Sequence, residues 1–494
     1  MGSLATLQST AENSPPDAAE PAATAVSRGG VARSAIWVVI ARGWSVLATA
    51  GLGIMLRRWF GDNVTACGEA VLLISLVGIA SMIASFGLPE TMIRLVASRL
   101  ARGESGAVRQ LLRRCSLLLL GTSLTTAIVT ATYYYLHGFA LFDLPGSALL
   151  AAVVAAAIIA LSWQMVDAAV LRGLHDVKWA NLLSGGQSGG PIAVTSLLVL
   201  LAVVFSQVPA ASVTSTLVAQ LLLFALIGTT VITVWRLFHI LPPAVELDAA
   251  AEPVPSVLQL LGDALPIALS QVAAFCTLSA DLWLTGSFLG IEDVAYYGSA
   301  KQLVLLLGVP EQLAMLTIIA IIPDLYARGQ LVQLQRVVRQ AVTLAALPAI
   351  AAAAVLIACP TFVLSSIYGD KYVAGGTVLV VLTLGQLTAN VLGPCGYVLL
   401  MTGRRWTVLA ITLSCGIAAI VLGAAGAYFG GMKGLAIAAA SCTAVQIILE
   451  WIAARWFVGI WCHASPTMIG EALRRPPPVS ISADIAPLDQ DPPL

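Results

Sequence analysis

The sequence predicts an all-α polytopic membrane protein with about twelve transmembrane helices in two six-helix bundles. Of its 494 residues, 59% are hydrophobic and only 10% are charged, whereas a soluble domain carries about 25% charged residues. The apolar runs are each close to the roughly 20 residues that cross the hydrocarbon core as a helix. Alternating segments of roughly ten residues, which would indicate a membrane β-barrel, do not occur.

The composition also excludes several functions. The net charge is zero, and basic clusters occur only beside apolar runs, so the sequence does not indicate nucleic-acid binding. None of the eight cysteines has CxxC spacing and most lie inside apolar runs, which is typical of buried free thiols. The four histidines are far apart in the sequence. We therefore expect no metal site, no disulfide and no cofactor.

The first half of the chain begins with a polar segment. Residues 1–33 are rich in Ala, Ser, Pro and Glu and lack the apolar core of a signal peptide, which predicts a disordered cytoplasmic tail. An amino-terminal six-helix bundle is expected over 34–235. Its apolar runs lie at roughly 34–56, 66–88, 115–136, 147–171, 182–207 and 212–235.

The second half repeats this arrangement. A polar stretch at 236–263 is interpreted as a cytoplasmic linker, and a carboxy-terminal six-helix bundle is expected over 264–456. Its apolar runs lie at roughly 264–288, 298–322, 341–359, 375–401, 407–429 and 434–456. Residues 457–494 are expected to form a second cytoplasmic tail.

The basic residues predict the orientation. Six arginines lie between Arg94 and Arg114, in a segment that is interpreted as the loop 89–114. With this loop in the cytoplasm, about 19 Lys and Arg residues face the cytoplasm and about 5 face outward, which is the bias that sets membrane topology. Both termini are therefore expected on the cytoplasmic side of the membrane.

The two halves show a faint internal repeat after their first helices. The segments FGDNVTACGEA (60–70) and LGIEDVAYYGSA (289–300) share Val, Gly and Ala at the same spacing. Six helices in each half would make these parallel repeats, and transporters often place the substrate path between such repeats.

Polar side chains inside the predicted spans indicate where a substrate would bind, because charges at bilayer depth require a cavity or a partner. In the first span, Arg42, Ser45 and Thr49 are spaced so that they lie on one face of the helix. Pro310 and Pro394 are expected to interrupt their helices. The candidate cavity residues are Arg42, Ser45, Thr49, Gln271, Asp281, Lys301, Glu311, Gln386 and Asn390.

Two interpretations of these charges stay open. Arg42, Asp281 and Glu311 either face an aqueous cavity or form a buried structural ion pair. In a cavity, the arginine fork suits phosphate oxygens, and the acidic groups either balance charge or couple transport to protons. Asp167 and Glu450 lie near the ends of their spans and are interpreted as snorkelling to the interface.

Several segments carry a family resemblance. They are RRWFGDNVTACGEAVLLISLVGIASMIASFGLPETMIRLVAS (57–98), SADLWLTGSFLGIEDVAYYGSAKQL (279–303), IIPDLYARGQ (321–330), IYGDKYVAGGTVLVVLTLGQL (367–387), MTGRRW (401–406) and YFGGMKGLAIA (428–438). In this order they resemble the polysaccharide/oligosaccharide transporter family, the Wzx-like lipid-linked oligosaccharide flippases of the MOP superfamily. The segment CGEA departs from the commoner Gly-aromatic pairing of that family.

The resemblance, which covers roughly residues 35–460, implies a MATE/MOP-like V-shaped transporter that works by alternating access. The implied substrate is an undecaprenyl-pyrophosphate-linked oligosaccharide, flipped to the outer leaflet for capsule, exopolysaccharide or O-antigen synthesis. The implied partners are this substrate and membrane lipids, with proton or sodium coupling left open. A basic cavity receives the pyrophosphate in such flippases, and Arg42 is the clearest basic residue within a span.

Three alternatives remain. A glycan polymerase or ligase would place catalytic residues in a long outer loop, but the expected outer loops are short, so we do not expect an enzyme. A multidrug or cation exporter of the same superfamily would share the fold. A lipid II flippase usually has two further helices, and this sequence does not contain them.

Overall fold

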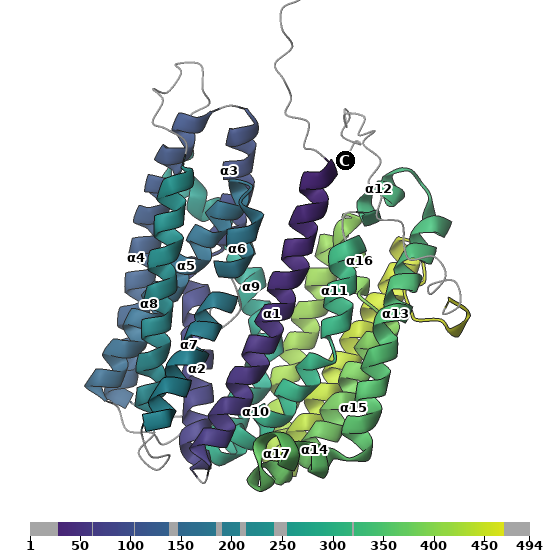
Figure 1. The fold of residues 1–494 in the computed structure, drawn as a ribbon. Coiled ribbons are helices and arrows are strands. Elements are labelled where there is room, and N and C mark those ends of the chain that lie inside the picture. Colours follow the sequence, from purple (N-terminus) through teal and green to yellow (C-terminus); the bar gives the residue numbers. More distant parts are fainter. Residues whose placement is uncertain are drawn as a thin grey trace, which may run out of the picture.

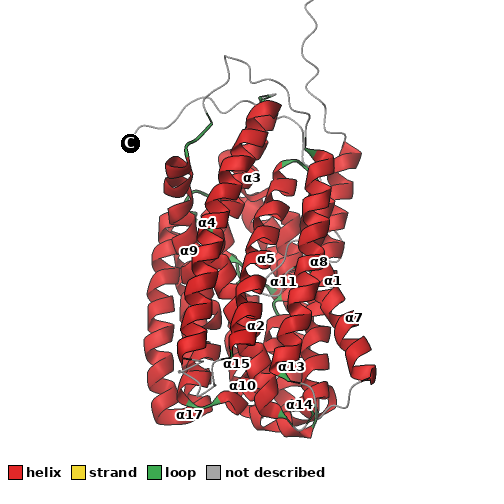
Figure 2. Ribbon diagram, turned by 90° about the vertical axis from the view of Figure 1, so that its left-hand side faces the viewer, coloured by secondary structure: helices red, strands yellow, loops and turns green. Residues whose placement is uncertain are grey.

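The computed structural model describes residues 28–468 except 62, 103, 138–146, 184–189, 208–213, 242–253, 319 and 320. Most of the amino-terminal tail, the middle of the linker and most of the carboxy-terminal tail lie outside these residues. The described chain contains helices and no strand (Figure 2). The predicted all-α fold is confirmed.

The first half of the chain forms one bundle (Figure 1). Its helices are α1 Arg28–Phe60, α2 Val64–Ser85, α3 Leu88–Ala101, α4 Ser105–His137, α5 Ala148–Gly173, α6 Val177–Leu183, α7 Pro191–Gln207 and α8 Ser215–Ile240.

The second half forms the other bundle (Figure 1). Its helices are α9 Val257–Phe288, α10 Ile291–Leu306, α11 Val309–Ile318, α12 Ile321–Ala327, α13 Leu331–Ala358, α14 Pro360–Tyr368, the 3₁₀ turn η3 Asp370–Gly375, α15 Gly376–Leu392, α16 Cys395–Met401, α17 Arg405–Phe457 and the 3₁₀ turn η4 Pro466–Met468.

In the part of the chain that the structure describes, each predicted span lies mainly on helix. Among the described residues, eight helices are long and apolar enough to cross a membrane. One of them, α17, has 53 residues and contains the last two predicted spans, joined at Gly431. A Cβ on Gly434 would lie 2.2 Å from the carbonyl oxygen of Gly426, although eight residues of straight helix extend about 12 Å. The two arms of α17 therefore fold back on each other.

Proline interrupts two helices where the sequence predicts it. The helix α10 ends at Leu306 and α11 begins at Val309, beside Pro310. The helix α15 ends at Leu392 and α16 begins at Cys395, with Gly393 at a φ of +80° between them. Proline supplies no N–H for the helical ladder, so carbonyls near each break need other donors.

The expected loop at 89–114 is wrong, because most of this segment is helical. It contains α3 and the start of α4. Leu88, Met92 and Val96 follow at four-residue intervals and are fully buried, while Arg94 lies on the opposite, exposed side. An amphipathic pattern of this kind favours a helix at the edge of a core. The arginines gave the segment the composition of a loop.

Buried side chains show how the halves meet. One hydrophobic cluster contains residues from both halves, including Leu52 and Cys67 from the first and Tyr297 and Tyr372 from the second. Two further clusters are separate. One gathers around Leu88 with residues of the first bundle and the start of α9, and the other contains only second-half residues. The described halves thus share a core at one end and have separate cores at the other.

We call the shared end the closed end, and define it by residues 53–68 of the first half and 291–302 and 366–372 of the second. The two segments of the predicted repeat meet there. A Cβ on Gly68 would lie 2.2 Å from the carbonyl oxygen of Ile291, so the two backbones touch. The hydroxyl of Thr65 donates to Glu292 at 3.2 Å. In Figure 1 this end lies at the bottom, and the amino end of α1 lies at the top.

The helix α9 contacts both bundles. Near its start, Leu260 and Ala264 belong to the first-half cluster. Near its end, Leu282 belongs to the shared cluster, and the Trp283 indole donates to Ser75 at 3.0 Å. The chain therefore crosses from one bundle to the other within a single helix.

Part of the expected carboxy-terminal tail is packed. After α17, Ile460 and Cys462 are buried in the second-half cluster. The backbone N–H of Trp461 donates to Gln335 at 2.9 Å, and that of Ser465 donates to Thr343 at 3.1 Å, so this segment follows α13.

Candidate functional site

A polar cavity of about 220 Å³ lies in the first half, between α1, α3, α5 and α6. Arg42 and Ser45, two of the predicted cavity residues, line it from α1, and Glu90 lines it from α3. Arg172 and Asn181 complete the polar lining from the ends of α5 and α6. We call it the first-half cavity.

Two guanidinium groups share this cavity with one carboxylate. Arg172 is close enough to Glu90 for attraction and to Arg42 for repulsion. Its Nη2 donates to Oδ1 of Asn181 at 3.4 Å, and the Asn181 amide donates to the Val177 carbonyl at 2.7 Å, so α6 orients Arg172. The three charged groups carry a net charge of +1. Planar guanidinium forks bind phosphate and carboxylate oxygens with paired, charge-assisted hydrogen bonds.

Arg172 is one of three polar residues of this cavity that the sequence does not identify, the others being Glu90 and Asn181. It lies at the end of a span, in the segment LRGLHDVKWAN, where a basic residue usually flanks the membrane. Its position beside Arg42 depends on α6, which packs against both α5 and α1. No spacing within the sequence carries that information.

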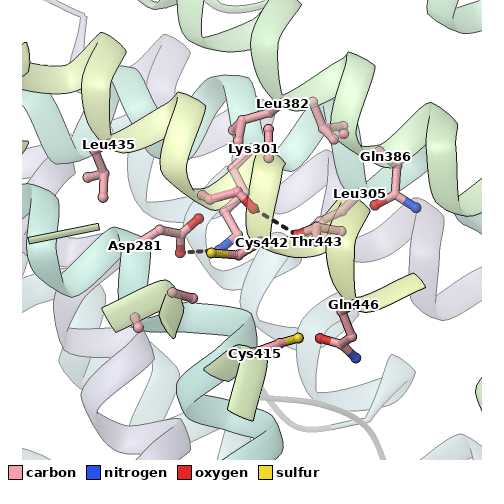
Figure 3. Close-up of a pocket in the computed structure, with 16 residues that line it drawn as sticks. Asp281, Lys301, Leu305, Leu382, Gln386, Cys415, Leu435, Cys442, Thr443 and Gln446 are labelled. Atoms are coloured by element: carbon pink, nitrogen blue, oxygen red, sulfur yellow. Dashed lines mark hydrogen bonds and ion pairs between the residues drawn. The ribbon is translucent and has the colours of Figure 1, made fainter. Parts of the chain in front are cut away.

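A second cavity, of about 130 Å³, lies within the second half (Figure 3). Three predicted residues line it, which are Asp281 from α9, Lys301 from α10 and Gln386 from α15. Thr443 and Gln446 of α17 also face it. We call it the second-half cavity.

Two residues that line the second-half cavity, Asp281 and Lys301, form an ion pair between α9 and α10. The Lys301 ammonium donates to Oδ1 of Asp281, and the Tyr297 hydroxyl donates to Oδ2 at 3.0 Å. The side chains of Lys301 and Asp281 are 18% and 12% exposed. The sequence left open whether Asp281 faces a cavity or forms a buried ion pair. In the structure Asp281 does both.

Asn390 and Gln386 form a polar chain to the break after α10. The Gln386 amide donates to Oδ1 of Asn390 at 3.3 Å, and the Asn390 amide donates to the Leu307 carbonyl at 3.1 Å. Leu307 lies between α10 and α11, so Asn390 satisfies a carbonyl at the interrupted ladder. This contact gives Asn390 a structural role.

Three other predicted residues line neither cavity. Thr49 contributes its backbone carbonyl, which accepts from the Gln302 amide at 2.9 Å. The side-chain oxygen of Gln271 is buried without a hydrogen-bond partner among the described residues. Glu311 lies in the first turn of α11, within electrostatic range of Glu450.

The snorkelling expected of Asp167 and Glu450 is wrong. The two residues are only 7% and 5% exposed. Glu450 accepts from the Gln446 amide at 3.1 Å, and a Cβ on Gly396 would lie 2.7 Å from its carboxylate, so α16 covers it. A carboxylate side chain is short, and neighbouring helices enclose these two before they reach an interface.

Thiols and acidic groups form no metal site among the described residues. Six of the seven described cysteines are buried, as expected, whereas Cys359 is exposed.

Known proteins share the fold of this chain. A family described as polysaccharide biosynthesis protein matches residues 33–325. An inward-facing multidrug-resistance MATE transporter of the MOP superfamily has a TM-score of 0.64 at 18% identity, over 86% of this chain and 98% of that one. The lipid II flippase MurJ, in an inward closed conformation, has a TM-score of 0.62 at 12% identity, over 85% and 87%.

A third similar structure is a MOP-superfamily transporter from Pyrococcus furiosus, described as having a binding pocket of reverse polarity. Its TM-score is 0.57 at 17% identity, over 87% of this chain and 95% of that one. No curated protein sequence matches significantly. These structures confirm the MOP-type fold that the sequence resemblance implied.

Proposed function

The chain belongs to the polysaccharide biosynthesis protein family, and we propose that it flips an undecaprenyl-pyrophosphate-linked oligosaccharide across the bacterial inner membrane. The first-half cavity is the observation that carries this proposal. It contains Arg42 and Arg172 with a net charge of +1, which suits the pyrophosphate of such a substrate.

The arrangement of the halves supports a direction of entry. Arg42 lies about 14 residues into α1, in the part of the bundle where the two halves have separate cores. The closed end blocks the opposite side through contacts such as that between Gly68 and Ile291. With both termini in the cytoplasm, a headgroup would enter from the cytoplasmic leaflet, bind the arginines, and leave after the closed end opens.

The second-half cavity is suited to balancing charge during this cycle. Asp281 is held by Lys301 and Tyr297 rather than by a first-half arginine, so the substrate site and this pair are separate. The carboxylates of Asp281 and Glu311 are the groups that a proton or sodium ion would use for coupling.

A multidrug or cation exporter remains the second candidate because the fold matches such a transporter. The paired guanidiniums of the first-half cavity repel a cationic drug, so this cavity favours an anionic substrate. A lipid II flippase would carry the same pyrophosphate chemistry, and the glycan that is lost on deletion distinguishes it.

The test is surface glycan export in a deletion strain that is complemented with variants. Arg42→Lys keeps the charge and loses the fork, and Arg42→Gln loses both, so export should decrease from wild type to Arg42→Lys to Arg42→Gln. A hydrogen bond to a charged group contributes about 1.5–3 kcal/mol, so Arg42→Gln should slow export roughly tenfold to a hundredfold.

Arg328→Gln is the matched control, because Arg328 forms an exposed i,i+4 pair with Asp324 away from both cavities. Normal export by Arg42→Gln at normal protein level would refute the phosphate site. Loss of peptidoglycan synthesis with intact surface glycan would identify the lipid II alternative.

A further inference from the structure

A second arginine of α1 is buried at the closed end. Arg57 is only 3% exposed, and lies where α1 meets α10 and α14 of the other half. It is not part of the first-half cavity. The sequence places it beside Arg58 at the end of a span, where it resembles an ordinary flanking charge.

The partners of Arg57 are all uncharged. Its Nη1 donates to the Gly53 carbonyl at 3.0 Å and to Oε1 of Gln302 at 2.5 Å. Its guanidinium carbon lies 4.9 Å from the centre of the Tyr368 ring. Among the described residues, Nε is buried without a hydrogen-bond partner, and Arg57 has no ion pair. A buried cation in such surroundings keeps a strong affinity for an anion.

Most of this environment belongs to the other half. Gln302 is on α10 and Tyr368 is on α14, whereas Gly53 is on α1 itself. When the halves separate at the closed end, Arg57 retains the Gly53 carbonyl and loses the contacts with Gln302 and Tyr368. The freed donors then face the space that opens between the halves.

The geometry of α1 aligns Arg57 with Arg42. Fifteen residues separate them, which corresponds to about 22 Å along an α-helix and a rotation of about 60°. The two arginines therefore lie on neighbouring faces of one helix, Arg42 near its middle and Arg57 near its carboxy-terminal end. Arg42 lines the first-half cavity in this structure, whereas Arg57 is enclosed at the closed end.

We propose that Arg57 is the exit-side anion site, which binds the diphosphate group of the substrate once the closed end opens. This inference rests on the proposed function and adds a second site to it. Arg42 binds the diphosphate in the present state and Arg57 binds it in the opposite state. An anion shifts a two-state equilibrium toward the state in which it binds more tightly, so each arginine favours its own state.

The experiment measures the distance between the two halves at the closed end, from the distance between two spin labels in lipid nanodiscs. Spin labels are attached to Thr65→Cys and Asp370→Cys in a chain whose native cysteines are replaced by alanine. These positions lie on opposite halves of the closed end, and both side chains reach solvent. The probe is undecaprenyl pyrophosphate, and inorganic pyrophosphate in a parallel sample distinguishes a free anion from a lipid headgroup.

Single variants test the contributions of Arg42 and Arg57 separately. In Arg42→Gln, undecaprenyl pyrophosphate should increase the long-distance, open population at least threefold, because Arg172 and Glu90 then leave the first-half cavity without a net positive charge while Arg57 is intact. In Arg57→Gln, the same lipid should increase the closed population, because only the first-half cavity with Arg42 and Arg172 remains. Arg57→Lys in the Arg42→Gln background should restore part of the opening, and the Arg42→Gln/Arg57→Gln double variant should not respond.

The outcomes separate this inference from the proposed function. Closing in Arg57→Gln without opening in Arg42→Gln would overturn the exit-side site and leave the proposed function intact. No response in either single variant would overturn the proposed substrate itself. If Arg57→Gln opened the closed end without any lipid, Arg57 would be a latch that only holds the halves together, and the inference would be wrong.

Discussion

At the scale of single residues, the pair Asp281–Lys301 shows how a charge is tolerated inside an apolar bundle. Both side chains are mostly buried, and the carboxylate has a second donor in Tyr297. Such a pair stabilises a fold weakly overall, because desolvation offsets most of the attraction. Removing one partner strongly destabilises the fold, since it leaves the other charge buried without compensation.

We therefore expect Lys301→Met to destabilise the protein by about 3 kcal/mol. The double variant Asp281→Asn/Lys301→Met should recover most of this loss, because it removes both charges. The free energy of unfolding in mixed detergent micelles measures both effects. Arg328→Met is the control, since its exposed ion pair contributes at most about 1 kcal/mol. A double variant as unstable as the single one would show that Lys301 acts through packing.

The sequence predicts some of these residues and misses others for a physical reason. Arg42 and Asp281 are recognisable because a charge deep inside an apolar run needs a cavity or a partner. Arg57 and Arg172 lie at the ends of their spans, where arginines usually face lipid headgroups. Only the packing of distant helices shows that Arg57 is enclosed and that Arg172 reaches the cavity of Arg42.

At the scale of elements, the segment 458–468 shows how the chain after the last helix is held against α13. His463 lies between the indole of Trp451, whose Nε1 is 3.4 Å from Nδ1, and Arg339, whose Nη2 is 3.4 Å from Nε2. Both neighbours are hydrogen-bond donors. Burial first, and then the charge of Arg339, lower the pKa of His463 below its ordinary value of 6.5.

This lowered pKa predicts that the segment loosens in acid. The packed segment holds a neutral ring, whereas a detached segment takes up a proton near pH 6.5, so protonation favours detachment. The stabilisation is complete above about pH 6.5 and decreases as the pH falls below that value toward the folded pKa.

Hydrogen exchange of residues 458–468, corrected for intrinsic rates, should therefore increase between pH 7.5 and 5.5. His463→Gln removes the titrating group and should abolish the pH dependence. An equal pH dependence in that variant would assign the effect to another group.

The elements also show which parts of the fold the hydropathy of the sequence predicts and which it does not. Long apolar runs were found because lipid imposes a minimum length on each helix, and both proline breaks follow from the missing N–H. The helix α3 was missed because only one side of it is apolar. The crossing of α9 between bundles was missed because an apolar helix looks the same whichever bundle it contacts.

At the scale of the whole molecule, one shared core and two separate cores define a structure closed at one end. The shared core contains residues from both halves of the sequence, and the separate cores divide them. A rocking movement of the halves would keep the separate cores intact and divide the shared one. The predicted repeat segments 60–70 and 289–300 meet at this shared core, which is the arrangement expected of parallel repeats.

The orientation of this assembly is testable by labelling. Single cysteines at exposed positions 109 and 336 should react with a membrane-impermeant maleimide only after the cells are opened. A cysteine at exposed position 370 should react in intact cells, because the basic-residue bias places the closed end outside. Labelling of position 109 in intact cells would reverse the topology, and with it the direction of transport.

The closed end also has a consequence for how this sequence can change over generations. Arg58 donates to the backbone carbonyls of Ser366 and Ile367 at the end of α14, the latter at 2.7 Å. Every amino acid has a backbone carbonyl, so substitutions at 366 and 367 leave these acceptors in place. Gly68 is the opposite case, since any side chain there would collide with the backbone at Ile291. Random mutation should therefore accumulate on the α14 side of the closed end and be removed by selection at Gly68.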